Sequence, residues 1–245
     1  MATFPLKTTL AVAIAAVGLS SIAQAQQYGD GDDVVAISAW NYDDLYNNGG
    51  FDAGWLLDRD VSTADEDDIG SVENVLLNDN NQIEAIIVQI GGIWGIGDTH
   101  VAVPWDQVDI SNEHIQVPLN ADNYEDFNLF AGGNERLTKN ALQQTTQVDD
   151  DVEAGGQIWK ITDLLNDYTS VSSGAGYGYI DNVLFNDDGQ IQAVVVSGGY
   201  GMYAFPFYGY GYRWDPSYES YNLPYSAEEA AGMETFNIDR YVGNE

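Results

Sequence analysis

The chain has 245 residues, no cysteine, and 39 acidic against 7 basic side chains, which gives a net formal charge of −32. Without cysteine it has neither disulfides nor thiolate metal sites nor cysteine nucleophiles. A surface this acidic repels nucleic-acid phosphates and anionic lipid, because binding either requires lysine and arginine to displace counterions.

The composition nevertheless indicates a folded protein. Hydrophobic residues make up 44% and aromatic residues 12% of the chain, which is too much for an acidic disordered polymer. Many carboxylates with very little lysine are typical of proteins kept soluble in concentrated salt, where screening removes the self-repulsion. We therefore expect a halophilic protein from a salt-loving bacterium.

The first 25 residues have the pattern of a secretory signal peptide. Lys7 gives a basic start, the apolar run "TLAVAIAAVGL" is too short to span a bilayer, and "AQA" ends at Ala25. Cleavage before Gln26 would leave an exported protein, periplasmic or secreted, without stable membrane insertion. An uncleaved membrane anchor is the alternative, and the short apolar run speaks against it.

A short helix is expected soon after this leader. The stretch "NYDDLYNNGG" places Tyr42, Leu45 and Tyr46 on one helical face and ends at Gly49-Gly50, which is a typical helix stop.

Two stretches, beginning at Ile69 and Tyr177, are almost the same: "IGSVENVLLNDNNQIEAIIVQIGG" and "YGYIDNVLFNDDGQIQAVVVSGGY". A shift of 108 residues aligns them and also carries Leu56-Leu57 onto Leu164-Leu165. One unbroken register over this length indicates a duplicated unit.

Each copy predicts a β-hairpin. Two segments rich in Val, Ile and Leu flank the turns "NDNNQ" and "NDDGQ", whose Asn, Asp and Gly residues tolerate positive φ. Asn81 and Gly189 occupy equivalent positions where a left-handed residue is expected. Since the strands are apolar on both faces for part of their length, they suit a small barrel better than an open, half-solvated sheet.

A third strand is expected in each copy, "THVAVPW" in the first and "MYAFPF" in the second, now with a shift of 102 residues. After Pro104 and Pro206 the apolar positions change parity in both copies. This change predicts a bulge or bend at both places.

The segment between the copies is polar and acidic, as in "TTQVDDDVEAGGQ", and is predicted to be a linker. Near the C-terminus, Ser226 and Glu229 form a capping box, which predicts a short helix.

The stretch "DIGSVENVLLNDNNQIEAIIVQIGGIWGIGDTHVAVPWDQV" resembles the PRC-barrel family, named after the H subunit of the photosynthetic reaction centre and also found in a ribosome-maturation factor. Copy one, roughly 54–115, fits closely; copy two, roughly 159–212, fits in the hairpin and departs in the following loop. The motif is a fold signature without a catalytic residue. The resemblance implies small barrels of about five or six strands, used mostly for docking or assembly.

We therefore expect an all-β protein of two small PRC-type β-barrels in tandem with short flanking helices. The expected divisions are a signal peptide at 1–25, PRC-barrel domain 1 at 36–118, an acidic linker at 119–155, PRC-barrel domain 2 at 156–225 and a C-terminal helix and tail at 226–245.

Known catalytic and cofactor motifs were sought without result. The sequence contains no G-x-S-x-G, no phosphate-binding Gly-Lys loop and no H-E-x-x-H. Its two histidines, His100 and His114, have no cysteine beside them, so we expect surface or strand-edge histidines and no metal site. We expect no cofactor and no catalytic residue.

Two alternatives remain open. Acidic runs such as "DRDVSTADEDDIG" invite a calcium-binding interpretation, although none matches the EF-hand loop. Paired carboxylates could serve a carbohydrate-active enzyme, but with 39 acidic residues some pair falls at a suitable separation by chance.

The aromatic residues supply the candidate interaction surface. The run "YGMYAFPFYGYGYRWDPSYESYNLPY" begins at Tyr200, and Trp94 stands in the loop "GGIWGIG" of the first copy. Tyrosine and tryptophan combine apolar area with a hydrogen-bonding tip, as binding surfaces require. The expected surface residues, which have no counterpart among the core positions of the other copy or lie in this loop, are Tyr208, Trp214, Tyr218, Tyr221 and Trp94. Tyr210 and Tyr212 are expected instead to replace Val108 and Ile110 in the second core, because the repeat alignment pairs these positions.

These observations predict a non-enzymatic binding or scaffolding module of the cell envelope. Its partners would be envelope proteins, with no nucleic acid among them, and the sequence does not decide between monomer and homodimer.

Overall fold

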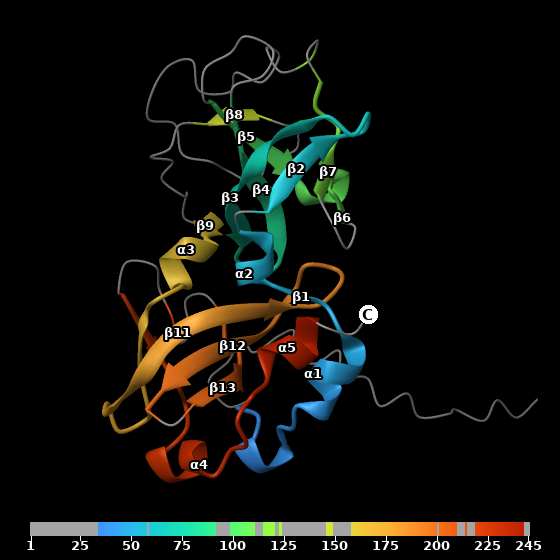
Figure 1. The fold of residues 1–245 in the computed structure, drawn as a ribbon. Helices are drawn as coiled ribbons and strands as arrows, with labels where there is room; N and C mark the ends of the chain where they lie inside the picture. Colours follow the sequence, from blue (N-terminus) through green and yellow to red (C-terminus); the bar gives the residue numbers. More distant parts are fainter. Residues whose placement is uncertain are drawn as a thin grey trace, which may run out of the picture.

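The fold was analysed in a computed structural model. The structure describes residues 34–57, 59–91, 99–110, 115–120, 123, 146–148, 158–199, 201–209, 214 and 219–242. These residues form two β-sheets with a few short helices between and around them (Figure 1), which confirms the expected all-β fold. The segments predicted as signal peptide and, for the most part, as linker lie outside the described residues. None of the helices in the described ranges is long and apolar enough to cross a bilayer.

The upper sheet in Figure 1 has eight strands in the described part of the chain and is called the eight-stranded sheet. Its strand order is β6 (Asp109–Ile110), β7 (Ile115–Val117), β2 (Asp60–Thr63), β3 (Asp68–Asn78), β4 (Ile83–Ile90), β5 (Thr99–Pro104) and β8 (Thr146–Val148). The remaining strand, β9 (Ile158–Lys160), pairs with β3 outside this path.

The lower sheet has six described strands and is called the six-stranded sheet. Its order is β13 (Gly201–Pro206), β12 (Ile191–Gly198), β11 (Gly176–Phe185), β10 (Tyr168–Ser170) and β14 (Ser220–Asn222). The sixth strand, β1 (Phe51–Asp52), pairs with β11.

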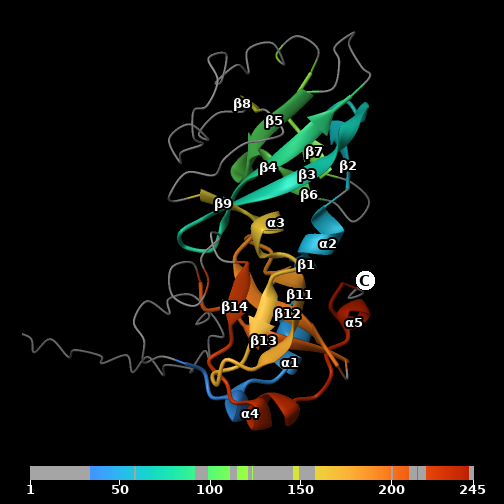
Figure 2. The same ribbon diagram turned by 90° about the vertical axis from the view of Figure 1, so that its left-hand side faces the viewer.

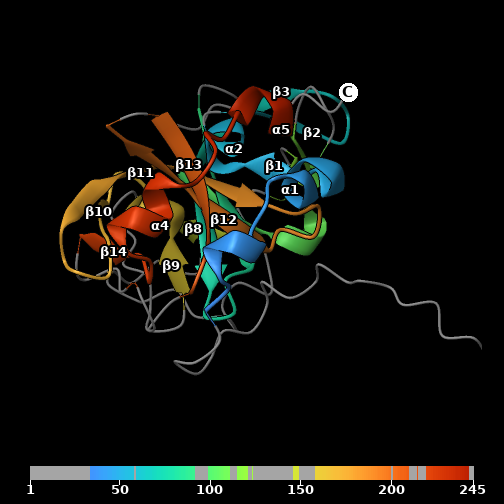
Figure 3. The ribbon, with the colours of Figure 1, turned by 90° about the horizontal axis from the view of Figure 1, so that it is seen from below.

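The described helices are all short: η1 (Ile37–Ala39), α1 (Asp43–Asn48), α2 (Ala53–Leu56), η2 (Trp105–Gln107), α3 (Ile161–Leu164), α4 (Ala227–Ala231) and α5 (Ile238–Val242). Figure 3 shows α1, α4 and α5 gathered on the six-stranded sheet. The predicted terminal helices are confirmed: α1 ends at Gly49, and α4 starts from a capping box in which Ser226 accepts from the Glu229 amide.

The two sheets share one topology. In each, an antiparallel meander (β2 to β5, and β10 to β13) is followed by a strand that returns parallel to its first member: β7 beside β2, and β14 beside β10. The predicted hairpins are present, with Asn81 at φ 61° and Gly189 at φ 79° in their turns. The bend predicted in the first copy is also present, because β5 ends at Pro104 and η2 follows.

Two equivalent glycines allow the long hairpin strands to lie close together. A Cβ on Gly70 would fall 1.9 Å from the carbonyl oxygen of Gln89, and one on Gly178 would fall 2.2 Å from that of Ser197. Gly70 also has φ +150°, which L-residues rarely adopt. The glycine at the start of each copy is therefore required by backbone contact.

The two repeats exchange a strand. β1 precedes the first hairpin in the chain but pairs with β11, joining Phe51 to Phe185; β9 precedes the second hairpin but pairs with β3, joining Trp159 to Leu77. Figure 2 shows β1 and β9, with their helices α2 and α3, at the boundary between the sheets. Both pairings are equivalent under the 108-residue shift, so the exchange is reciprocal.

The same two-fold relation governs the turn-to-turn contact. Ile83 donates its amide to the Gly189 carbonyl at 2.9 Å, and Ile191 donates to the Asn81 carbonyl at 3.0 Å. Gln82 and Gln190, themselves equivalent, form an isolated bridge with each other. The chain is thus an internal pseudo-dimer.

One apolar cluster runs through both sheets, since Val72, Val75 and Leu77 of β3 belong to the same cluster as Ile180 and Val183 of β11. A second cluster fills the other face of the six-stranded sheet, where Leu184 and Val195 meet rings from α1 and the C-terminal segment. The domain boundaries 36–118 and 156–225 stay predictions. Strand exchange and a shared core mean that neither range packs by itself.

Candidate functional site

The aromatic run that the sequence singled out is largely internal. Tyr208, Trp214 and Tyr221 are buried, so the exposure expected for them is wrong. The Tyr208 amide donates to the Tyr221 hydroxyl at 3.1 Å, and Tyr208 and Tyr225 share a hydrogen bond between their hydroxyls. Their rings fill the core and their hydroxyls satisfy polar groups. The core positions expected for Tyr210 and Tyr212 lie outside the described residues. Tyr218 and Trp94 lie outside the described residues.

This buried tyrosine pair contacts Val35, near the first of the described residues. The Val35 amide donates to the Tyr208 hydroxyl at 3.2 Å, and the Tyr225 hydroxyl donates to the Val35 carbonyl at 3.0 Å. The two tyrosine hydroxyls thus bind the backbone of the segment around Val35 to the six-stranded sheet.

His100 also differs from expectation. It is buried in β5, with Gln89 of β4 on one side and Val148 of β8 on the other, and is therefore neither a surface nor a strand-edge histidine. His114 lies outside the described residues. Within the described ranges, no three His, Asp or Glu side chains are grouped so that they could hold a metal ion.

Asp167 is a buried carboxylate beside the boundary between the sheets. Its Oδ2 accepts the indole N–H of Trp214 at 2.5 Å, and the Trp214 ring meets the Trp159 ring of β9 edge to face at 4.7 Å. Burial raises the pKa of Asp167 to about 6, the Trp214 hydrogen bond opposes this rise, and the charges of Glu219 and Asp163 add to it. A raised carboxyl pKa is a common mark of functional sites, although structural burial produces it too.

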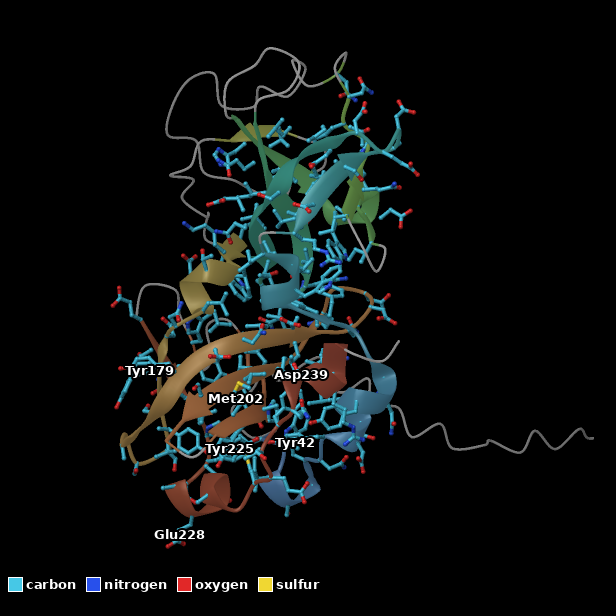
Figure 4. The ribbon with its side chains drawn as sticks, viewed as in Figure 1. Tyr42, Tyr179, Met202, Tyr225, Glu228 and Asp239 are labelled. Carbon is cyan, nitrogen blue, oxygen red and sulfur yellow. The ribbon has the colours of Figure 1, made fainter. Side chains whose placement is uncertain are left out.

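Two tyrosines are exposed on the outward face of the six-stranded sheet. Tyr168 of β10 and Tyr179 of β11 are direct cross-strand neighbours and retain 42% and 57% of their surface. Their ring centroids lie 5.5 Å apart with an interplanar angle of 69°. Figure 4 shows Tyr179 projecting at the border of the lower unit, away from the tyrosines that pack inside. We call Tyr168 and Tyr179 the tyrosine corner.

Two exposed acidic residues lie close to the tyrosine corner along the backbone. Asp181 follows Tyr179 by two residues, at the bulge of β11. The Tyr168 amide donates to the backbone carbonyl of exposed Glu219 at 3.4 Å. The corner therefore belongs to the acidic surface of a chain with a net charge of −32.

Three residues of this region were not predicted from the sequence, although the repeat contains a signal for each: Tyr168, Tyr179 and Asp167. The 108-residue shift pairs the two tyrosines with Asp60 and Ser71, so polar residues of one copy become aromatic in the other. It pairs Asp167 with Arg59, which reverses the charge. Aligned positions that carry different residue types in the two copies are positions that the packing common to both copies does not constrain.

The first repeat, with its hairpin and third strand, is the part of the chain in which the sequence resembles the PRC-barrel family. A PRC-barrel domain is found at residues 49–124. The match covers less than half of the chain and includes β1, the strand that the PRC-barrel domain contributes to the other sheet. A comparison with curated proteins finds no match.

Proposed function

We propose that this protein is a non-enzymatic protein-binding module of the cell envelope, built from two PRC-barrel units in tandem. The observation that carries the proposal is the division of its aromatic residues. Tyr208, Trp214 and Tyr221 are used for packing, whereas Tyr168 and Tyr179 stand exposed in an acidic surrounding. Large aromatic residues left on a surface are typical of interfaces.

We include the second repeat as a PRC-barrel unit because its structure matches that of the first repeat. Its strands repeat the order, the parallel return and the bulge positions of the first repeat, as in the register shifts after Val72 and Ile180. The proposal that the protein is exported rests on the signal-peptide pattern at 1–25. A chain without cysteine needs no disulfides to fold in an oxidising compartment.

A carbohydrate-active enzyme is the second candidate, because Asp167 has the raised pKa that a general acid needs. Its geometry favours a structural role. The carboxylate is buried, and its Oδ2 accepts from Trp214, whose ring packs on Trp159 of β9. We therefore assign Asp167 to the packing at the sheet boundary.

The proposal is tested by retention of partners on the immobilised mature chain, residues 26–245, from an envelope extract at high salt. We expect a protein that is retained, and that binds again in stoichiometric amount after purification. The matched control is the same chain with Tyr168→Ser and Tyr179→Ser, which leaves the net charge unchanged. If nothing binds the native chain beyond what binds a urea-unfolded sample, the proposed function is wrong.

A further inference from the structure

The two sheets differ along one row of outward-facing residues. In the eight-stranded sheet the row across β2, β3, β4 and β5 consists of polar side chains: Asp60, Ser71, Gln89 and His100. In the six-stranded sheet the equivalent row is Tyr168, Tyr179, Ser197 and Met202. The second sheet has therefore gained two aromatic rings where the first has a carboxylate and a hydroxyl.

The two rings are in contact with each other. Tyr168 rests against the main chain, since its hydroxyl occupies the space that a Cβ on Gly176 would take. Tyr179 meets it edge to face at an interplanar angle of 69°, with centroids 5.5 Å apart. Both rings keep exposed surface, so a group from a partner can lie against an aromatic face there.

The chemistry of the corner favours a cation. The face of an aromatic ring is electronegative and attracts ammonium and guanidinium groups within about 6 Å of its centroid. Asp181 and Glu219 are exposed residues close by along the backbone, and the net charge of −32 makes the surface attractive to cations. In the described part of the chain no basic side chain lies over Tyr168 or Tyr179.

The protein already uses this contact elsewhere. Arg240 lies over the ring of Tyr46 with its Cζ 4.1 Å from the centroid, and Arg59 lies over Trp55 at 4.6 Å. Both pairs help to hold a short helix, α1 or α2, in place. At the tyrosine corner the same type of ring is present without such a partner from the described residues.

We propose that the tyrosine corner receives a lysine or arginine side chain from a partner protein. This inference rests on the proposed function and narrows it, because it states the charge of the residue that the partner presents. The acidic surface steers the basic segment toward the sheet, and the two rings select the cation over a neutral group of the same shape.

The test uses the mature chain and two short peptides, acetyl-Gly-Arg-Arg-Gly-amide and its citrulline analogue, which is neutral and nearly isosteric. Dissociation constants are measured from the backbone amide NMR shifts of Gly176 and Gly178 during titration. A concentration of roughly 0.5 M NaCl screens the diffuse attraction of the acidic surface. We expect saturable shifts with the arginine peptide and none with citrulline.

Two double variants separate the ring faces from apolar bulk. Tyr168→Phe with Tyr179→Phe keeps both π faces, and we expect its affinity to stay within about twofold of the native chain. Tyr168→Leu with Tyr179→Leu keeps bulk without a π face, and we expect binding roughly five- to thirty-fold weaker. Melting temperatures and amide spectra of both variants report whether they fold.

Each other outcome overturns the inference. Equal shifts with the citrulline peptide would mean that the corner does not select charge. Unchanged affinity in the folded leucine variant would mean that the acidic surface alone attracts the peptide. Absence of shifts with the native chain would mean that the corner binds no basic side chain.

The two proposals can fail separately. If a partner is retained on the mature chain and the leucine variant retains it equally, the module binds proteins through another surface and only the tyrosine corner is rejected. If no partner is retained while the arginine peptide binds with the expected selectivity, the proposed function fails and the cation site stands.

Discussion

The two sheets descend from one pattern and protect their edges in different ways. In the eight-stranded sheet β5 is covered by another strand, β8, in which Thr146 pairs with Ala102. In the six-stranded sheet the equivalent residue is Ala204 of β13. Its carbonyl accepts the indole N–H of Trp40 at 2.8 Å, and its amide donates to the Tyr42 hydroxyl at 3.2 Å. Side chains from the N-terminal segment thus replace a whole strand.

The comparison of the two sheets shows which positions of the duplicated unit have kept the same role and which have changed. The inward residues, the close-approach glycines and the exchanged strands kept their two-fold relation, because a change in one copy would disturb the shared core. The edges and outward faces diverged, and the tyrosine corner belongs to this divergent part. Asp167, which stands where the first copy has Arg59, is a divergent position that is buried.

The largest effect is expected from breaking the strand exchange. Trp159→Ala removes a buried ring of β9 that contacts Trp214 and Phe207, and should cost about 3–5 kcal/mol of unfolding free energy. Phe51→Ala, the equivalent change in β1, should cost about 3 kcal/mol, since its ring stacks on Phe185. Urea unfolding followed by circular dichroism measures both.

The control for this pair is Tyr179→Ala, an exposed aromatic change that should stay within about 0.5 kcal/mol. A Trp159→Ala variant as stable as this control would show that the exchanged strand contributes little.

The next effect concerns the equivalent glycines. Gly70→Ala should destabilise by about 2 kcal/mol, because the methyl group meets the Gln89 carbonyl and the positive φ is strained. Gly178→Ala should cost less, since it adds the clash with Ser197 without an unfavourable φ. Gly199→Ala, with nothing within 4 Å of its added carbon, is the neutral control in thermal unfolding. An inverted order would refute the close-approach argument.

The edge comparison is tested by Trp40→Phe, which keeps an aromatic ring and removes the hydrogen bond to Ala204. We expect a loss of about 1 kcal/mol. Amide hydrogen exchange in β13 should become faster, while exchange in β5 stays unchanged. Equal acceleration in both strands would indicate general destabilisation and would count against edge protection by this side chain.

The smallest expected change in stability concerns Asp167, the position equivalent to Arg59 in the first copy. Because the folded-state pKa of Asp167 is raised to about 6, its ionisation costs stability as pH rises through the window from about 4 to 6. Asp167→Asn keeps an acceptor for Trp214 and removes this cost. We expect the variant to be more stable by on the order of 1 kcal/mol above pH 7, with the difference vanishing near pH 4.

Melting curves at fixed salt across this pH range provide the measurement. A gain that persists unchanged at pH 4 would mean that ionisation of Asp167 is not its cause.

Much of the fold could be predicted because its signals are local. The Val- and Ile-rich strands, the turns with Asn81 and Gly189, the bend at Pro104 and the capping box at Ser226 each require only neighbouring residues. The strand exchange could not be predicted. β1 and β9 contain two and three residues, and nothing within such short strands specifies which hairpin they join.

The candidate site was predicted less well for a related reason. Tyrosine is amphipathic, so the sequence does not show whether Tyr208 or Tyr168 finds a partner for its hydroxyl inside the core. The parallel return of β14 brings Tyr221 and Tyr225 inward, and this is a long-range event. The aligned differences at Asp60 and Ser71 were the better guide to the surface.

The reciprocal exchange has a consequence for the order of events during synthesis. A ribosome that has made only the PRC-barrel domain at 49–124 has made a strand, β1, whose neighbour β11 does not yet exist, and a hairpin whose neighbour β9 is still missing. The first repeat therefore cannot complete its strand pairing until β9 and β11 have been synthesised. We expect the nascent chain to become compact late and in one step. A chain that stays unfolded until its synthesis is nearly complete is well suited to pass through a narrow channel before it folds.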